Sequence, residues 1–293
     1  MKLETQMISK QIKTGIVKGN LKLLVIIAMM LNGMLVFAQE DKSNPDAEIA
    51  KKMQDPLAYI AAVMSDNDFL FKTGQDDFSF SSSIQPVKAW SFDEAGFNFV
   101  ARGVVPVLGL APESRKPPIV GEPLPSGDGA TWGLSDMITQ FFFSPKSGGS
   151  WKWGAGPMFS LKTRTDEKLA GPGWGTGPVG VLVGGSGNFA FAFIGGHLWS
   201  FDGDFSTSIF QPMIYFNFPT KPGLSLAYNN QISYNWKASD DAFTVPLGFS
   251  LNRSWGMKGG NGLELGIGPY WNVVRPQGTA ESMLRLNVAW IFP

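Results

Sequence analysis

The apolar and polar residues of this chain follow two different periods. Beyond residue 65, apolar residues recur at every second position, and the positions between them carry mostly Gly, Ser, Thr, Asn and Gln. Because successive side chains of a strand point to opposite faces, this period predicts strands with one apolar and one wetter face. The segments are 67–73, 78–88, 97–107, 132–143, 151–163, 174–183, 189–201, 209–218, 225–236, 243–252, 263–273 and 284–292. The pattern thus predicts about twelve strands.

A different period occupies residues 45–64. Ile49, Met53, Leu57 and Ile60 recur at spacings of three and four, which predicts a helix that Pro56 kinks or divides. The expected organisation is a signal peptide over 1–38, a helical segment over 39–64 and a barrel over 65–293.

The amino end has the pattern of an export signal. Several lysines precede an apolar run at 23–38, and Ala38 is a small residue that suits a signal peptidase. The alternative is an uncleaved membrane anchor, but the run is short for a spanning helix and contains Asn32 and Gly33. The sequence therefore predicts export and cleavage after Ala38.

The composition of the chain indicates which face of the strands contacts water. Only 16% of residues are charged, and the positions opposite the apolar ones carry few of these charges. A soluble sandwich or small soluble barrel would need a more charged outer coat. An apolar exterior around a wet interior fits better, and tryptophans near strand ends resemble interfacial aromatic girdles. These are Trp132, Trp151, Trp199, Trp236, Trp271 and Trp290. The expected fold is an all-β, transmembrane antiparallel up-and-down β-barrel with a short N-terminal helical segment.

The last strand carries its own signal. It alternates strictly and ends on an aromatic residue, Phe292, two positions after Trp290. Such an ending resembles the signal by which outer-membrane barrels are recognised for insertion, although Pro293 follows the aromatic. Trp290 and Phe292 are therefore the expected insertion signal, read by the barrel-insertion machinery in the outer membrane of a Gram-negative bacterium.

Several classes of chemistry are disfavoured. The formal net charge is zero, so no basic stripe indicates a nucleic-acid partner, and the absence of cysteine excludes disulfides and thiolate metal sites. The glycines at 175, 177 and 180 spell a dinucleotide motif, but strand-like residues follow where a helix is needed. His197 is the only histidine and is expected to point toward lipid. We expect no catalytic residue, no metal site and no cofactor; a membrane-embedded hydrolase using His197 is the weakest alternative.

Short motifs suggest one family. They are WGLSDM (132–137), FFFSP (141–145), WGTGPVG (174–180), WSFDGD (199–204), QPMIYFN (211–217), TVPLG (244–248) and YWNVVRPQG (270–278). Over roughly residues 55–293 the chain resembles bacterial outer-membrane proteins carried under the misapplied name neuromedin U, which are similar to barrels named from a phenol-degradation pathway. The resemblance implies an outer-membrane transporter and brings no established substrate or functional residues.

Strand parity selects candidate residues for the lumen. A charged side chain that faces lipid in the middle of the bilayer destabilises the barrel, so charged residues of the strands are expected to face the lumen. The candidates are Arg102, Lys152, Lys162, Glu264, Arg285, Asn229, Gln231 and Asn272. Two interpretations stay open: these groups line a selective passage, or they pair across a filled lumen.

The expected function is an outer-membrane channel or transporter that passes small, hydrophobic or aromatic solutes without a cofactor. Its expected partners are the outer-membrane bilayer, the insertion machinery and a small-molecule solute. The alternative is a structural or adhesive barrel. The helical segment at 45–64 is either a plug at the periplasmic mouth or a linker.

Overall fold

The structure is a computed structural model that describes residues 44–73, 77–114, 130–146 and 149–292. The expected signal peptide at 1–38 and the start of the helical segment at 39–43 lie outside the described residues. The elements treated below all belong to one compact unit, residues 43–293.

The described chain is dominated by strands. A helix, α2 (Pro45–Met53), comes first, and a short 3-10 turn, η1 (Lys258–Gly260), precedes the last two strands. The strands are β1 (Ala61–Thr73), β2 (Asp77–Phe92), β3 (Phe97–Leu110), β4 (Thr131–Leu134), β5 (Met137–Pro145), β6 (Trp151–Leu161), β7 (Gly175–Ser186), β8 (Phe189–Ser200), β9 (Ser206–Asn217), β10 (Leu224–Asn229), β11 (Ile232–Asn235), β12 (Phe243–Gly248), β13 (Ser250–Gly256), β14 (Gly262–Val274) and β15 (Ser282–Phe292).

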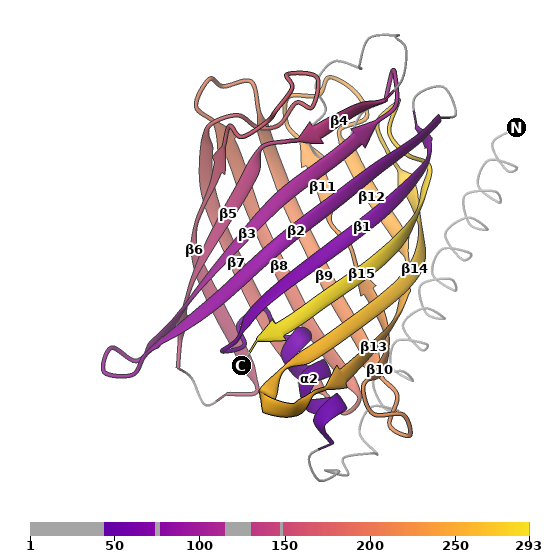
Figure 1. The fold of residues 1–293 in the computed structure, drawn as a ribbon. Coiled ribbons are helices and arrows are strands. Elements are labelled where there is room, and N and C mark those ends of the chain that lie inside the picture. The colour runs from indigo at the N-terminus through magenta and orange to yellow at the C-terminus, as the bar shows by residue number, and fades with distance from the viewer. Residues whose placement is uncertain (1–43, 74–76, 115–129, 147–148, 293) are drawn as a thin grey trace, which may run out of the picture. The chain divides into compact units, whose positions relative to one another are not determined.

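These segments form a closed antiparallel barrel of twelve strands, which confirms the expected fold (Figure 1). Each strand pairs with its neighbours in the chain, and β15 pairs with both β14 and β1, so that no edge remains. The closing pair runs in register from Ala61 opposite Phe292 to Phe71 opposite Ser282. Closure matters because an unpaired backbone group in lipid costs several kcal/mol.

Three barrel strands are each built from two segments. β4 and β5 both pair with β3, β10 and β11 both pair with β9, and β12 and β13 both pair with β14. The interruptions fall at Ser135–Asp136, at Asn230–Gln231 and at Phe249. At the first two interruptions consecutive residues line the same internal cavity, which a regular strand does not allow.

The outer surface of the barrel is apolar. Along β14, for example, Leu265, Ile267 and Trp271 are exposed, whereas Glu264 and Tyr270 are buried inside. All six tryptophans expected at strand ends are exposed. A contiguous apolar exterior of this kind suits hydrocarbon and would be unusual in water.

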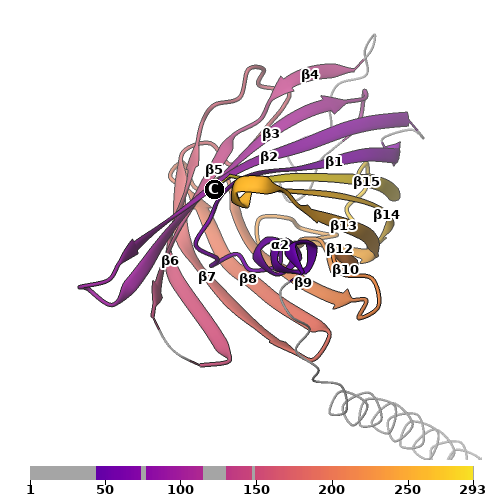
Figure 2. The same ribbon diagram turned by 60° about the horizontal axis from the view of Figure 1, so that its bottom comes forward.

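The helix α2 lies within the ring of strands at one end of the barrel, the end where β15 also finishes (Figures 1 and 2). The Asn44 side chain caps it by accepting from the backbone N–H of Asp46, and Pro45 occupies its first turn. The helix ends at Met53, and β1 begins at Ala61, four residues ahead of the expected start of the barrel. No helix in the described part of the chain is long and apolar enough to cross a bilayer.

The apolar exterior generates a stability prediction. Replacing Ile267, near the middle of β14 and facing outward, by Lys should lower the free energy of unfolding in lipid by about 2–4 kcal/mol. Urea titration of the folded fraction in vesicles measures the change. Thr220→Lys, in an exposed turn, is the control and should leave stability nearly unchanged. Equal stability of both variants would show that this face does not meet hydrocarbon.

Candidate functional site

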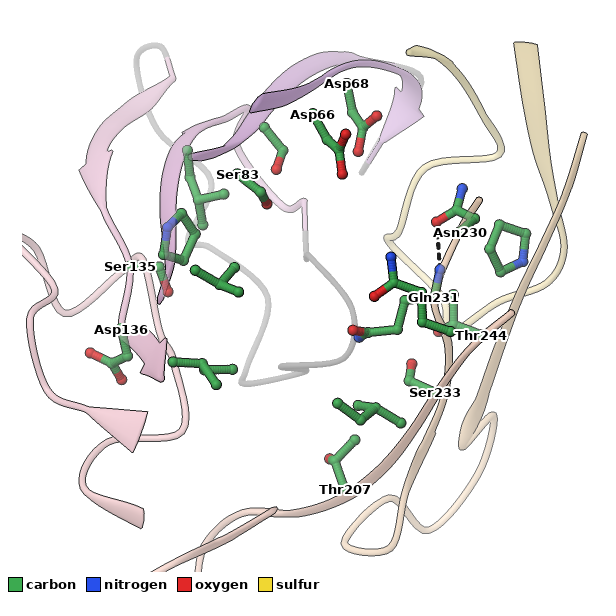
Figure 3. Close-up of a pocket in the computed structure, with 18 of the residues that line it drawn as sticks. Asp66, Asp68, Ser83, Ser135, Asp136, Thr207, Asn230, Gln231, Ser233 and Thr244 are labelled. Atoms are coloured by element: carbon green, nitrogen blue, oxygen red, sulfur yellow. Dashed lines mark hydrogen bonds between the residues drawn. The ribbon is translucent and has the colours of Figure 1, made fainter. Parts of the chain in front are cut away.

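A cavity of about 220 Å³ lies inside the barrel. Its lining comes from inward-facing residues of strands all around the wall and from the interrupted strand positions (Figure 3). In that view Asp66 and Asp68 lie on one side, Ser135 and Asp136 on another, and Thr207, Ser233 and Thr244 opposite. Asn230 and Gln231 lie next to each other, and the Asn230 side chain accepts from the Gln231 backbone N–H at 2.9 Å. The cavity is the candidate site because it lies inside the barrel and brings together charged, amide and hydroxyl groups from many strands.

One wall of the cavity is held by a buried ion pair between neighbouring strands. Arg285 of β15 donates to Asp68 of β1 through Nε at 2.6 Å and through Nη2 at 2.8 Å. Its Nη1 donates to the backbone carbonyl of Asn229, across the lumen, at 2.8 Å. The guanidinium also lies 5.4 Å from the ring centre of Tyr270. Arg285 therefore links β15 to β1, to the end of β10 and to Tyr270 of β14, and the bidentate pair with Asp68 fixes its side chain.

A second polar group surrounds Arg102 of β3. Its Nη1 donates to Gln140 at 2.9 Å and its Nη2 donates to Gln85 at 2.6 Å. Gln85 in turn donates to Asp66 at 3.0 Å, and Asp66 also accepts from Asn287 at 2.5 Å. Arg285 therefore pairs directly with a carboxylate, whereas Arg102 is connected to Asp66 only through the side-chain amide of Gln85.

Part of the cavity wall is apolar. Ile138, Met158, Leu198 and Ile209 line it, and they belong to or pack against a larger hydrophobic cluster inside the barrel. The cavity thus presents aliphatic groups as well as charged and amide groups. Such a lining can accommodate a solute that has both a polar and an apolar part.

The segment after β6 closes one end of the cavity. Thr163 and Thr165 hydrogen-bond to the backbone at the end of β4 and at the β4–β5 interruption, where no strand pairs with β4 on that side. Leu169 is fully buried against Leu108 and Leu110, and Ala170 and Pro172 line the cavity. We call residues 162–174 the cap.

A buried ion pair fastens the cap. The Asp136 carboxylate, at the interruption between β4 and β5, accepts from Arg164 Nε at 3.1 Å and Nη2 at 2.5 Å, and from the backbone N–H of Gly173 at 2.7 Å. Burial alone lowers the pKa of Arg164, but the hydrogen bonds and the charge of Asp136 outweigh it, so the pKa lies above its ordinary value. Arg164 therefore stays charged at any ordinary pH.

The segment 44–60 lies across one mouth of the barrel (Figure 2), and glycines make room for it. Gly256 and Gly262 lie opposite each other in β13 and β14. A Cβ on either would lie 2.6 Å from Pro45 or Ile49. Asp46 adds polar contacts there, accepting from Arg253 at 2.7 Å and from the Gly256 backbone at 2.9 Å.

The same segment then contacts the far side of the mouth. Gln54 and Asn217, at the end of β9, exchange two amide hydrogen bonds of 2.9 and 3.0 Å. Asp55 forms an ion pair with Lys152 of β6 at 2.5 Å, and Leu57 is buried beside Gly154. The carbonyl of Ile60 accepts from the backbone of β2. The segment 44–60 therefore bridges β13 and β14, β9, β6 and β2 across one mouth of the barrel.

The expected lumen residues divide into three groups. Arg102, Arg285, Gln231 and Asn272 line the cavity. Asn229 faces it through its side-chain hydrogen bond from Gln211, and Glu264 is buried inside the barrel below it, toward α2.

Two expected residues lie elsewhere. Lys152 lies at the mouth, where it pairs with Asp55 rather than lining the cavity. Lys162 does not face the lumen: β6 ends at Leu161, so strand parity no longer applies, and Lys162 pairs with Glu167 in the cap at 3.0 Å. Trp290 and Phe292 are exposed on the outer face of β15.

Sequence reasoning missed three carboxylates, Asp66, Asp68 and Asp136. The first two have the same parity as the buried Ala62 and Leu70 of β1, so the alternation could have placed them inside if this strand had been predicted from Ala62 onward. Asp136 lies at a strand interruption, for which the sequence offers no signal.

The two remaining motifs lie in β8 and β7. His197 lies on the outer face beside Trp199, and its ring nitrogens share hydrogen bonds with Ser208 at 2.8 Å and Ser206 at 3.1 Å. The glycines at 175, 177 and 180 lie within β7, with no helix after them. Among the described residues no cluster of three or more His, Asp or Glu side chains could hold a metal ion.

Comparison with known proteins supports the fold. No family model matches the chain, and no curated protein matches it. Among solved structures it is similar to the COG4313 outer membrane channel from Pseudomonas putida F1, with a TM-score of 0.55 and 14% identity over 81% of this chain and 98% of that one. The match to OccK5 (OpdH) from Pseudomonas aeruginosa has a TM-score of 0.34 and 11% identity over 80% and 98%.

At these identities the likeness to the Pseudomonas putida channel concerns the fold, an outer-membrane type of β-barrel, and nothing is built on the second match. The finer resemblance to proteins named neuromedin U or to phenol-pathway barrels receives no support from these comparisons.

The buried pair on the cavity wall generates a prediction. Arg285→Met leaves the Asp68 carboxylate buried without its partner and should lower the free energy of unfolding by about 3–5 kcal/mol. The double variant Asp68→Leu with Arg285→Met removes both charges and should recover most of the loss. Urea unfolding in detergent followed by gel migration measures both. A double variant as unstable as the single one would mean that the pair is not the source of the loss.

Proposed function

We propose that this protein is an outer-membrane channel for small solutes that carry both polar and apolar groups, which pass through the barrel lumen without a cofactor. The observation that supports this most is the internal cavity, whose lining combines charged and amide groups with aliphatic side chains. A barrel that served only as a structural anchor would have no need of a mixed, partly open interior.

The outer-membrane location belongs to the same proposal. The exposed apolar belt and the exposed tryptophans near strand ends are what a bilayer and its interfaces favour. Cleavage of the leader after Ala38 and recognition of Trp290 and Phe292 by the barrel-insertion machinery complete the route that we propose for the chain.

The size of the cavity limits the solute. Pockets for drug-sized ligands have volumes of about 300–1,000 Å³. The cavity here, of about 220 Å³, suits a smaller molecule. Its aliphatic wall would favour a hydrophobic or aromatic part, and Arg102 with the neighbouring amides would hold a polar end.

Passage requires both ends of the cavity to open. The cap, held by Asp136 and Arg164, restricts one end, and the segment 44–60 restricts the other. The contacts of that segment with opposite sides of the mouth favour a plug over a linker, because a linker needs no contacts across the opening. Movement of these two segments would then control flow.

Liposome swelling with zwitterionic amino acids tests the proposed function. Phenylalanine should enter faster than glutamine, although phenylalanine is the larger of the two, and faster than the large sugar raffinose. Ile138→Ser, on the aliphatic wall, should reduce the preference for phenylalanine about fivefold, as the loss of ~1 kcal/mol implies. Ile214→Ser, on the outer face, is the matched control and should keep the preference. No swelling with any solute would favour a filled, structural barrel.

A disulfide tests the plug. The natural chain has no cysteine. Ile49→Cys with Gly262→Cys would therefore form a single bond that locks α2 to β14 at a contact point. Single-channel conductance in planar bilayers should fall on oxidation and recover on reduction. Ile49→Cys alone should respond to neither treatment. Unchanged conductance in the oxidised double variant would show that the segment is a linker.

A further inference from the structure

Glu264 lies in an unusual position inside the barrel. It points inward from β14, two residues from Gly262, on which α2 packs, and it is only 8% exposed. Its Oε2 accepts from Ser254 at 2.6 Å. Within the described residues no Lys or Arg forms an ion pair with it, and the charged side chain that acts on it is another carboxylate, Asp66. A buried carboxyl group in this setting needs a proton or a cation to neutralise it.

Unpartnered oxygens lie beside this carboxyl group. Asn252 is 4% exposed and Ser225 is 1% exposed, yet Asn252 Oδ1 and Ser225 Oγ have no hydrogen-bond partner. The two residues lie opposite each other in β10 and β13. Buried polar atoms are nearly always paired, so each of these oxygens points to something that the protein itself does not supply.

The strand register gathers these groups into one row around the wall. Ser225 lies opposite Asn252, Asn252 opposite Gly266, Gly266 opposite Asn287, and Asn287 opposite Asp66. Ser254 lies opposite Glu264, one inward position away from Asn252 along β13. Diagonal neighbours at such a spacing are within reach of each other's side chains.

Gly266 lets the Asn252 amide lie at the centre of this row. A Cβ at that glycine would lie 2.1 Å from Asn252 Oδ1 and 3.2 Å from Asn287 Oδ1, so both amide oxygens turn toward the same point over bare backbone. The Nδ2 of Asn287 donates to Asp66 at 2.5 Å, which keeps its oxygen facing that point. Any side chain at position 266 would collide with the Asn252 amide oxygen.

The lumen arginines are engaged elsewhere. Arg285 is held by Asp68, and Arg102 is held by Gln85 and Gln140. Neither forms an ion pair with Glu264. The register therefore places Asn252, Asn287 and Glu264 at neighbouring inward positions of β13, β15 and β14, and among the described residues no Lys or Arg forms an ion pair with Glu264.

We propose that Glu264, with the side-chain oxygens of Asn252 and Asn287, forms a binding site for a hard inorganic cation between α2 and the cavity. Oxygen donors are the ligands such cations prefer, and few charges among the ligands make a site weak. A weak site suits a conduction path, because the ion must leave as well as enter. The site itself stands on the geometry, whereas its effect on flow rests on the proposed channel function.

Terbium luminescence tests the binding. The full mature protein in detergent is titrated with Tb³⁺, excited through its tyrosines, and the bound probe is then displaced with Ca²⁺. Glu264→Gln keeps the volume and a hydrogen bond with Ser254, and it should weaken Tb³⁺ binding at least about tenfold, or ~1.4 kcal/mol. Asn252→Leu should weaken it less.

The control is Glu281→Gln, a carboxylate outside the barrel strands that pairs with Lys72, and it should bind Tb³⁺ like the natural protein. Each variant must show the same heat-dependent gel migration, so that a folding defect is recognised. Wild-type Tb³⁺ affinity in Glu264→Gln, or failure of Ca²⁺ to displace the probe, would overturn the site and leave Glu264 neutralised by a proton.

The zero-current potential in a KCl gradient separates the site from the channel. If both proposals hold, the natural protein should prefer K⁺ over Cl⁻, and Glu264→Gln should reduce that preference severalfold. Current whose ion preference does not change in Glu264→Gln, together with unchanged Tb³⁺ binding, overturns the site alone. Absence of current in every variant, together with Tb³⁺ binding that depends on Glu264, supports the site and overturns the channel.

Discussion

The pairing of β1 with β15 is the interaction on which the rest of the structure depends. In hydrocarbon, backbone N–H and C=O groups have no water to bond, so a sheet can lie there only if it has no edge. The register from Ala61 and Phe292 to Phe71 and Ser282 removes that edge. Once the sheet is closed, side-chain alternation sends one set of residues to lipid and the other to the lumen, and every later feature of the protein follows from that division.

Polar side chains in the lumen need hydrogen-bond partners, whereas the apolar side chains of the exterior do not. The lumen has three kinds of such contacts: the direct pair of Asp68 and Arg285, the chain of hydrogen bonds from Arg102 through Gln85 to Asp66, and the contacts of the cap and the segment 44–60. The same groups that satisfy each other narrow the lumen to a small cavity. A few buried oxygens, Ser225 Oγ and Asn252 Oδ1 among them, have no hydrogen-bond partner within the described residues. Because buried polar atoms are nearly always paired, these oxygens are the candidate contacts for a bound solute or ion.

The alternating pattern predicted the twelve strands, their direction, the aromatic exterior and the inward position of Arg102, Glu264 and Arg285, because parity is a local property. It could not predict what depends on contacts far apart in the chain. The lack of side chains at Gly256 and Gly262, for example, is explained only by the contact of Pro45 and Ile49 with these two glycines. The interruptions at Asp136 and Gln231 break the alternation itself, and Lys162 was misplaced because parity was extended past the end of β6.

The proposed channel requires that the cavity lie on a water-filled path through the barrel. Since the chain has no cysteine, a single cysteine in place of Gln231, which faces the cavity, can be modified while current is recorded. A small charged methanethiosulfonate reagent should reduce the current through Gln231→Cys and leave Ile214→Cys, on the outer face, unaffected. Equal responses of the two variants, or a Gln231→Cys current that the reagent does not change, would contradict a path through the cavity.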